Sequence, residues 1–186
     1  MRRAYLRDMP PSVGSRVPDL TVEAYIRGER EPQSLAVPAH DGEWTALVFY
    51  PRDFTFVCPT ELQGFAELQH EFAAEGATLL AASTDSFYTH KAWFESHSLL
   101  ADVRYPVLAD PSHALSRAFG VLGQDGAALR GTFLIDPEGV VRHSSVTDLN
   151  VGRSPAETLR VLQALRTGEL CPVDWRPGVA TLSVAA

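Results

Sequence analysis

The sequence of 186 residues contains only two cysteines, Cys58 and Cys171, and no long apolar run. Two cysteines are too few for a disulfide scaffold, and because they do not form a CxxC pair, the vicinal dithiol of a disulfide oxidoreductase is absent. No segment approaches the roughly 18 consecutive apolar residues that a membrane span requires. These absences argue against a disulfide-stapled protein, a CxxC oxidoreductase and a membrane partner.

The charge balance and the motif content exclude further classes of function. The net charge of −7 leaves no basic surface for nucleic acid. Phosphate-binding and dinucleotide-binding glycine motifs are also absent. The six histidines are scattered without metal-ligand spacing, so no metal site and no cofactor are expected. His90 and His97 lie one heptad apart on a predicted helix, and we expect both on the solvated surface.

The N-terminal residues Met1–Asp8 are basic and are followed by no apolar stretch, which is not the pattern of a secretory signal. We therefore expect a cytoplasmic protein, in a reducing compartment where a structural disulfide does not persist. Repeats, low-complexity tracts and internal linkers are absent, so a single domain is expected. Its parts are a loose leader over 1–13, a folded region over 14–168 and a C-terminal tail over 169–186.

Hydrophobic patterning predicts an alternation of strands and helices. The continuous apolar run Thr45–Tyr50 is typical of a strand buried on both faces, and a helix is predicted from about Pro59 to Glu75, ending at Gly76. The other predicted strands are Thr21–Ile26, Gln33–Val37, Ala77–Thr84, Tyr105–Leu108, Thr132–Ile135 and Val140–Val146, and the other predicted helices are Asp85–His97, Ala114–Phe119 and a last one from Pro155 to Gly168. This order predicts an α/β protein with a mixed central sheet flanked by helices, the arrangement of the thioredoxin-like fold.

Cys58 lies where a strand gives way to a helix, because it follows the loop 51–57 and precedes Pro59. Proline suits the first helical position, so Cys58 is expected at the N-cap or in the first turn. Backbone N–H groups, the helix dipole and a nearby arginine can lower a thiol pKa from about 8.5 to between about 3.5 and 7.5. Since the thiolate is the nucleophile, redox sulfur chemistry is the leading hypothesis; an inert packing cysteine and a Cys–His hydrolase pair are the alternatives.

The segment around Cys58 resembles a known family. Pro51-x-x-x-Thr55-x-x-Cys58 resembles the active-site motif of the peroxiredoxins, and the surrounding residues 54–61 are similar to the typical two-cysteine subgroup, which includes the peroxidase component (AhpC) of bacterial alkyl hydroperoxide reductase. The likeness extends from about Gly14 to Gly178. Its other blocks are His90–Trp93, Tyr105–Asp110, Arg130–Asp136, Val151–Ser154 and Gly168–Pro172.

The resemblance implies a role for individual residues. Cys58 is implied to be the peroxidatic cysteine, which becomes a sulfenic acid, and Cys171 the resolving cysteine that forms a disulfide with Cys58 of a second subunit. The remaining implied roles are a hydroxyl that bonds the sulfur and the peroxide (Thr55), a shield against water (Pro51), a guanidinium that stabilises the sulfur's charge (Arg130), a carboxylate that orients the arginines (Glu61), a second guanidinium (Arg153) and a packing residue (Trp93).

The implied activity is reduction of hydrogen peroxide and alkyl hydroperoxides, without metal, haem or flavin. The implied electron donor is a dithiol protein, with thioredoxin, a flavoprotein reductase and an AhpD-like protein left open. The resemblance also implies a homodimer and a ring of dimers, with the ring size open. A redox-regulated holdase chaperone or peroxide sensor on the same scaffold is the alternative function.

The resemblance also leads to an expectation about over-oxidation. Eukaryotic members of the family slow disulfide formation with a Gly-Gly-Leu-Gly loop and a C-terminal helix that contains Tyr-Phe. Here residues 99–103 contain no glycine, and the chain ends Thr181-Leu182-Ser183-Val184-Ala185-Ala186. We therefore expect an enzyme that resists irreversible oxidation by excess peroxide.

Overall fold

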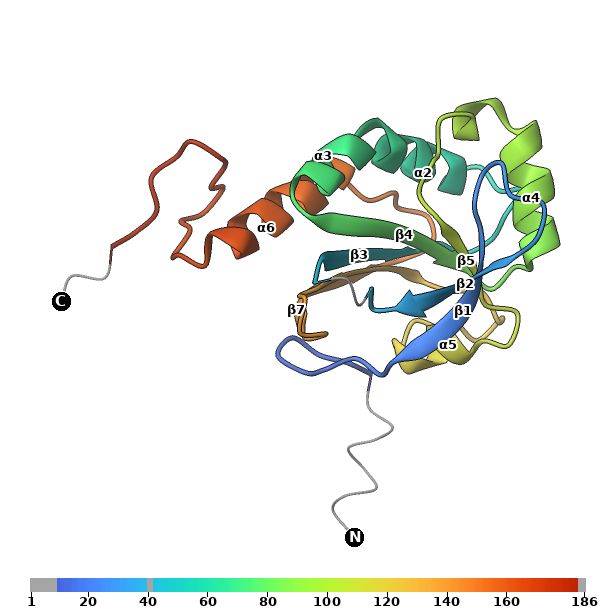
Figure 1. Cartoon of the computed structure of the whole chain (residues 1–186), viewed down its shortest axis with the longest axis horizontal. Coiled ribbons are helices and arrows are strands. Elements are labelled where there is room, and N and C mark those ends of the chain that lie inside the picture. The colour runs from blue at the N-terminus through green and yellow to red at the C-terminus, as the bar shows by residue number, and fades with distance from the viewer. Residues whose placement is uncertain (1–9, 40–41, 184–186) are drawn as a thin grey trace, which may run out of the picture.

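The computed structural model describes residues 10–39 and 42–183, which form one seven-stranded sheet with the strand order β2-β1-β5-β4-β3-β6-β7. Strands β3, β4 and β5 run parallel, and the remaining neighbours are antiparallel. The expected mixed sheet flanked by helices is therefore confirmed (Figure 1). The strands are β1 (Leu20–Tyr25), β2 (Gln33–Val37), β3 (Trp44–Phe49), β4 (Ala77–Ser83), β5 (Val107–Ala109), β6 (Arg130–Ile135) and β7 (Val141–Thr147).

Helices cover both faces of the sheet. Four of them, α2 (Cys58–Glu67), α3 (Gln69–Ala74), α4 (Phe87–Ser96) and α6 (Pro155–Thr167), lie on one face, and α5 (Ala114–Ala118) lies on the other (Figure 1). A short 3₁₀ helix, η1 (Ser98–Leu100), follows α4. Among the helices of the described residues, none combines the length and the apolar character that a membrane crossing needs.

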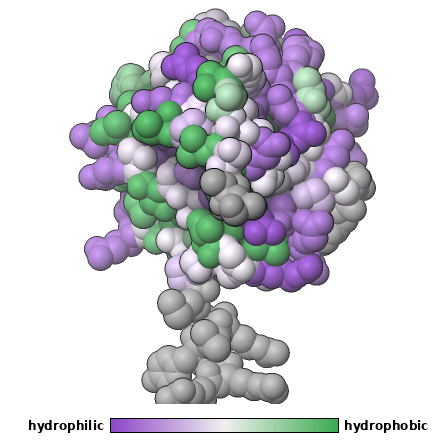
Figure 2. Space-filling model, turned by 90° about the vertical axis from the view of Figure 1, so that its left-hand side faces the viewer, coloured by the Kyte–Doolittle hydropathy of each residue, from purple (hydrophilic) through white to green (hydrophobic). Residues whose placement is uncertain are grey.

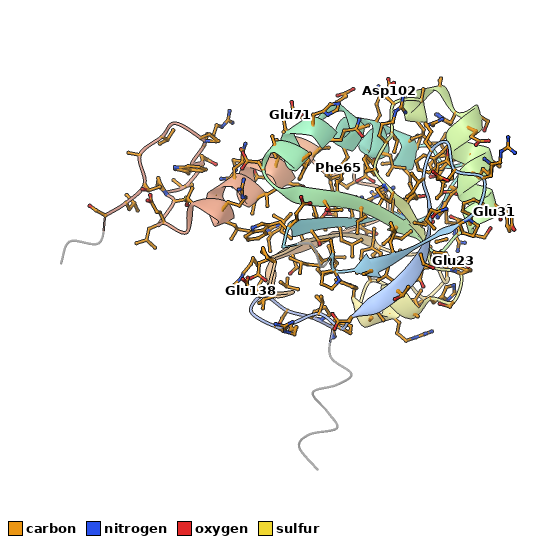
Figure 3. All side chains as sticks on the ribbon, viewed as in Figure 1. Glu23, Glu31, Phe65, Glu71, Asp102 and Glu138 are labelled. Carbon is orange, nitrogen blue, oxygen red and sulfur yellow. The ribbon has the colours of Figure 1, made fainter. Side chains whose placement is uncertain are left out.

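The buried strand β3 explains how one sheet supports two cores. Ala46 and Val48 belong to the core under α2, α4 and α6, whereas Leu47 and Phe49 belong to the core under α5. Successive side chains of a strand point to opposite faces, so a continuous apolar run is what a doubly covered strand requires. Figure 3 shows Phe65, from α2, lying between that helix and the sheet, where it fills the first of these cores.

The predicted helix over 59–75 is divided in two at Leu68, which is a correction to the single helix expected. The second helix, α3, begins at the polar residue Gln69. Its side-chain amide donates to the carbonyl oxygen of Asp102 at 3.0 Å and accepts from the N–H of Arg104 at 3.1 Å. This side chain satisfies two backbone groups of the segment after η1, a tertiary requirement that helical periodicity does not show.

The expectation that His90 is a surface residue is wrong. Its side chain is fully buried, and it shares a face of α4 with Trp93 and Phe94. His97 is half-buried, contacts the ring of Trp93 and accepts a hydrogen bond from the N–H of Leu99. Residues at spacings of three, four and seven share one face of a helix, so the apolar neighbours of His90 indicate the core side.

The two ends of the chain were expected to lie outside the folded region. Of the expected leader 1–13, residues 1–9 lie outside the described residues, as do 184–186 of the tail. Beyond Gly168 the tail forms a loop that is closed by a bridge between Leu170 and Leu182, and Figure 1 shows α6 carrying this loop away from the sheet. Trp175 is buried within the loop and donates from Nε1 to the carbonyl oxygen of Val179 at 2.8 Å.

Candidate active site

Cys58 is the first residue of α2, and Pro59 is the second, so the thiol lies in the first turn of the helix. The cysteine side chain is fully buried, although the loop that leads to it is open to solvent. Within that loop Phe54 is 61% exposed and Phe56 is 95% exposed. Phe54 also has a φ of 55°, in the left-handed region that is unfavourable for a bulky residue. A buried sulfur is thus held behind an exposed and partly strained loop.

Arg130 supplies the positive charge beside the sulfur. It begins β6, is almost fully buried, and donates from Nη1 to Cys58 Sγ at 3.5 Å. Nε and Nη2 both donate to the carbonyl oxygen of Leu149, at 2.9 and 2.6 Å, which fixes the plane of the guanidinium. An oriented cation in a water-excluded site stabilises negative charge on the sulfur and on an oxygen that leaves it.

Glu61 joins two arginines into one buried cluster. One of its carboxylate oxygens pairs with Arg130 Nη1, and the other accepts from the backbone N–H and the Nε of Arg153, both at 2.8 Å. Arg153 also donates from Nη1 to the carbonyl oxygen of Gly131 at 2.7 Å. Two cations and one carboxylate place an excess of positive charge beside the Cys58 sulfur. Burial of charges is costly unless they are paired in this way.

Two expected contacts with the sulfur differ in the structure. The hydroxyl of Thr55 donates to the carbonyl oxygen of Arg52 at 2.9 Å and not to Cys58, because the turn places that carbonyl within its reach. The backbone N–H groups of Thr60 and Glu61 donate to the carbonyl oxygen of Val57, at 3.1 and 3.3 Å. These N–H groups thus close the first helical turn, and the donor to the sulfur is Arg130.

The structure brings some of the remaining residues to the site and leaves one outside it. Pro51 is buried just beyond the end of β3, and Trp93 packs beneath the loop, with its ring centre 6.0 Å from that of Phe54. Cys171 lies in the tail, 3.4 Å from the hydroxyl oxygen of Thr167, and both cysteines are free. Since α6 carries the tail away from the start of α2, Cys171 is not part of the site around Cys58 in the same chain (Figure 1).

Sequence reasoning missed three contributors to this region. The carbonyl oxygen of Leu149 is a backbone group, and a sequence pattern gives no signal for it. Asp53 and His90 form a buried pair beneath the loop, with Asp53 Oδ2 2.7 Å from His90 Nδ1. The apolar stripe that contains His90 was the available signal. Within residues 10–39 and 42–183, His, Cys, Asp and Glu side chains form no group of three or more that could hold a metal ion.

Replacement of Glu61 by glutamine should destabilise the protein by about 3–5 kcal/mol, because it leaves two buried guanidinium groups without their shared carboxylate. Urea unfolding followed by circular dichroism measures this change. The control is Glu157→Gln, since Glu157 pairs with Arg160 on the surface of α6 and should cost less than about 1 kcal/mol. Equal effects of the two substitutions would show that the buried cluster does not support the fold.

Comparisons with known proteins agree with this geometry. The profile of the AhpC/TSA family matches residues 13–144. The chain is 43% identical to the putative peroxiredoxin YkuU of Bacillus subtilis over 175 residues, which cover 91% of this chain and 97% of that protein. It is 44% identical to the peroxiredoxin prdx-2 of Caenorhabditis elegans, over 91% of this chain and 88% of that protein.

Solved structures show the same likeness. The reduced 2-Cys peroxiredoxin of Plasmodium vivax superposes with a TM-score of 0.86 at 33% identity, over 92% of this chain and 93% of that one. The AhpC of Mycobacterium tuberculosis superposes with a TM-score of 0.82 at 36% identity, over 90% of this chain and the whole of that one. The thioredoxin-like fold expected from the sequence is therefore confirmed.

Proposed function

Because the chain belongs to the AhpC/TSA family and is a peroxiredoxin, a thiol-dependent peroxidase, we propose that Cys58 is the sulfur that attacks the peroxide. The observation that carries this proposal is the hydrogen bond from Arg130 Nη1 to the buried sulfur of Cys58. No other cysteine lies in the folded region 14–168, and Cys171 is in the tail.

The first half of the reaction takes place in the site around Cys58. The thiolate attacks the terminal oxygen of hydrogen peroxide or of an alkyl hydroperoxide, the O–O bond breaks, and the sulfur becomes a sulfenic acid. The other oxygen takes up a proton and leaves as water or an alcohol. Arg130 stabilises the charge that passes from sulfur to oxygen, while Glu61 and Arg153 hold Arg130 in place.

Two further residues complete the proposed site. Pro51 is buried beside the loop and keeps water from the sulfur. The hydroxyl of Thr55 keeps its lone pairs free to accept a hydrogen bond from the peroxide while it donates to Arg52. In this arrangement Thr55 orients the substrate without contacting the sulfur in the resting enzyme.

The second half of the reaction joins two subunits. Cys171 of a second copy attacks the sulfenic sulfur, an S–S bond forms, and the sulfenic oxygen leaves as water. Two observations support a partner in this step: the tail extends away from Cys58 of its own chain, and it exposes Leu170, Val173 and Val179. Figure 2 shows apolar side chains among polar ones on the face seen from the side of the tail.

The proposal also covers the electron donor, the assembly and the compartment of the enzyme. A dithiol protein returns the disulfide to two thiols; thioredoxin, a flavoprotein reductase and an AhpD-like protein are the candidates. The homo-oligomer is a dimer that assembles into a ring of dimers, and the compartment is the cytoplasm. Coupled turnover with each purified reductant, followed by non-reducing electrophoresis, identifies the donor.

Mixing two inactive variants tests the intersubunit disulfide. Cys58→Ser and Cys171→Ser should each lack reductant-coupled turnover. Cys58→Ser lacks the attacking sulfur, and Cys171→Ser cannot convert the sulfenic acid to a disulfide. A mixture that has exchanged subunits should recover activity, since Cys58 of one chain meets Cys171 of the other. Non-reducing electrophoresis should then show a covalent dimer with a single disulfide. A mixture that stays inactive after proven subunit exchange would rule out the intersubunit bond.

A further inference from the structure

A buried hydrogen-bonded network lies beneath the loop that carries Cys58, and none of the contacts of the sulfur involves it. Its members are Tyr50 directly after β3, Asp53 in the loop and His90 on α4, all of them buried. Asp53 Oδ2 lies 2.7 Å from His90 Nδ1, and Tyr50 donates from its hydroxyl to Asp53 Oδ1 at 2.7 Å. The loop is thus tied through Asp53 to a strand and to a helix.

Both ring nitrogens of His90 face hydrogen-bond partners. Nε2 lies 3.2 Å from the carbonyl oxygen of Leu108, which can only accept, so Nε2 carries a hydrogen. Nδ1 lies 2.7 Å from Asp53 Oδ2 and 3.3 Å from the hydroxyl oxygen of Tyr50. Burial raises the pKa of Asp53, while the hydrogen bond and the charge of His90 oppose that rise. Both ring nitrogens of His90 and both carboxylate oxygens of Asp53 therefore have a partner within the protein.

Asp53 is also the last buried residue of the loop before Cys58. Its backbone N–H donates to Asp85 Oδ2 at 2.8 Å, and the same carboxylate oxygen accepts from Ser83 Oγ at 2.9 Å. Beyond Asp53 the loop exposes Phe54 and Phe56 to solvent. Both the backbone and the side chain of Asp53 are therefore anchored, whereas the residues between it and Cys58 are not buried.

This placement matters for the step that follows oxidation. Cys58 is fully buried, so its sulfur cannot meet Cys171 of a second copy until residues 54–57 and the first turn of α2 move. Asp53 anchors the N-terminal end of the segment that must move. Its hydrogen bonds therefore oppose the opening, and loosening them lowers its cost.

We propose that the Asp53–His90 pair is a latch that sets how readily the active-site loop opens once Cys58 has become a sulfenic acid. The proposal rests on the proposed function. Asp53 and His90 are positioning residues, because they act through the loop and do not touch the sulfur. The latch affects which of two competing reactions the sulfenic acid undergoes. Condensation with a thiol forms a disulfide and releases water, whereas oxidation by a second peroxide gives a sulfinic acid and water or an alcohol.

His90→Phe tests the latch, because phenylalanine fills the same space without hydrogen bonding. Disulfide formation should become about tenfold faster, the effect of losing one buried hydrogen bond to a charged group. The peroxide concentration that half-inactivates the enzyme during turnover should rise by a similar factor, as measured by the mass of sulfinic product. The initial oxidation of Cys58, followed by tryptophan fluorescence, should change less than threefold because Arg130 is untouched.

Milder variants keep the test decisive if His90→Phe folds poorly. Tyr50→Phe removes only the hydroxyl that donates to Asp53. Like His90→Phe, it should raise the ratio of disulfide formation to over-oxidation. His90→Asn retains a short N–H donor toward Asp53 and should return the ratio toward that of the unmodified protein. The control is Leu115→Ala, which makes a cavity under α5 on the opposite face of the sheet and should leave the ratio unchanged.

The outcomes separate the latch from the proposed function. An unchanged rate of disulfide formation in both His90→Phe and Tyr50→Phe would overturn the latch, and so would an equal acceleration in Leu115→Ala. Failure of the unmodified protein to form a sulfenic acid at Cys58 would instead overturn the proposed function. Oxidation of Cys58 and formation of the disulfide are recorded in the same experiment on different time scales. A failure of the latch can therefore be told apart from a failure of the proposed function.

Discussion

Replacement of Cys58 by serine should reduce peroxide consumption to the background rate while the fold and the assembly persist. Serine is close to cysteine in size, so the buried position at the start of α2 is kept. Its hydroxyl is not ionised near neutral pH and does not reduce an O–O bond, whereas a thiolate does. Peroxide consumption with a dithiol reductant measures the loss, and gel filtration with circular dichroism checks the assembly and the fold.

This variant also separates the peroxidase from the holdase chaperone or sensor considered as the alternative. A chaperone that acts through its assembled surface should protect a client protein equally well with serine at position 58. Cys171→Ser is the matched control, since it should still oxidise Cys58 once per chain and then stop. Turnover that survives in Cys58→Ser would show that another group reacts with the peroxide.

Replacement of Arg130 by methionine should slow the oxidation of Cys58 by about 10²–10³-fold, the usual cost of removing one preorganised donor at a developing charge. Methionine keeps much of the length and volume but cannot donate to the sulfur or to the carbonyl oxygen of Leu149. Stopped-flow fluorescence at several peroxide concentrations gives the second-order rate constant. Binding of the reductant should not change.

Two further variants show whether geometry or charge is responsible. Arg130→Lys retains the charge, but a single ammonium cannot replace the planar guanidinium that bonds Leu149 and faces Cys58 together. An intermediate loss is therefore expected. Arg142→Met is the control, because Arg142 pairs with Asp136 at the partly exposed start of β7 and lies outside the site. A rate in Arg130→Met equal to that of the control would remove Arg130 from the mechanism.

Much of the sheet could be predicted because its signals are local. The apolar run that became β3 is buried on both faces, and the strands predicted at Thr132–Ile135 and Val140–Val146 are observed as the paired strands β6 and β7. Strand and turn preferences depend on neighbouring residues, so the sequence alone is enough to show them. Gln69 and His90 were misjudged for the opposite reason. Each is a polar residue whose partners come from distant segments, Asp102 and Arg104 for Gln69 and Asp53 for His90.

The candidate site likewise has local features that could be predicted from the sequence and contacts that could not. Cys58 was predicted at the start of a helix because Pro59, its covalent neighbour, suits the first helical position. The direction of the Thr55 hydroxyl was predicted wrongly, because it depends on the turn that brings the carbonyl oxygen of Arg52 close. A role inferred from resemblance names a residue, but it does not fix where a rotatable group points.

The sequence by itself determined which atoms are available: one cysteine in the folded region, placed at the junction of a buried strand and a helix. Only the tertiary structure decided what surrounds that sulfur. Arg130 is 72 positions away along the chain, and its guanidinium reaches Cys58 because the sheet places β6 beside β3 and Leu149 fixes its plane. Local conformation depends on adjacent residues, whereas such a distance depends on how the whole core packs.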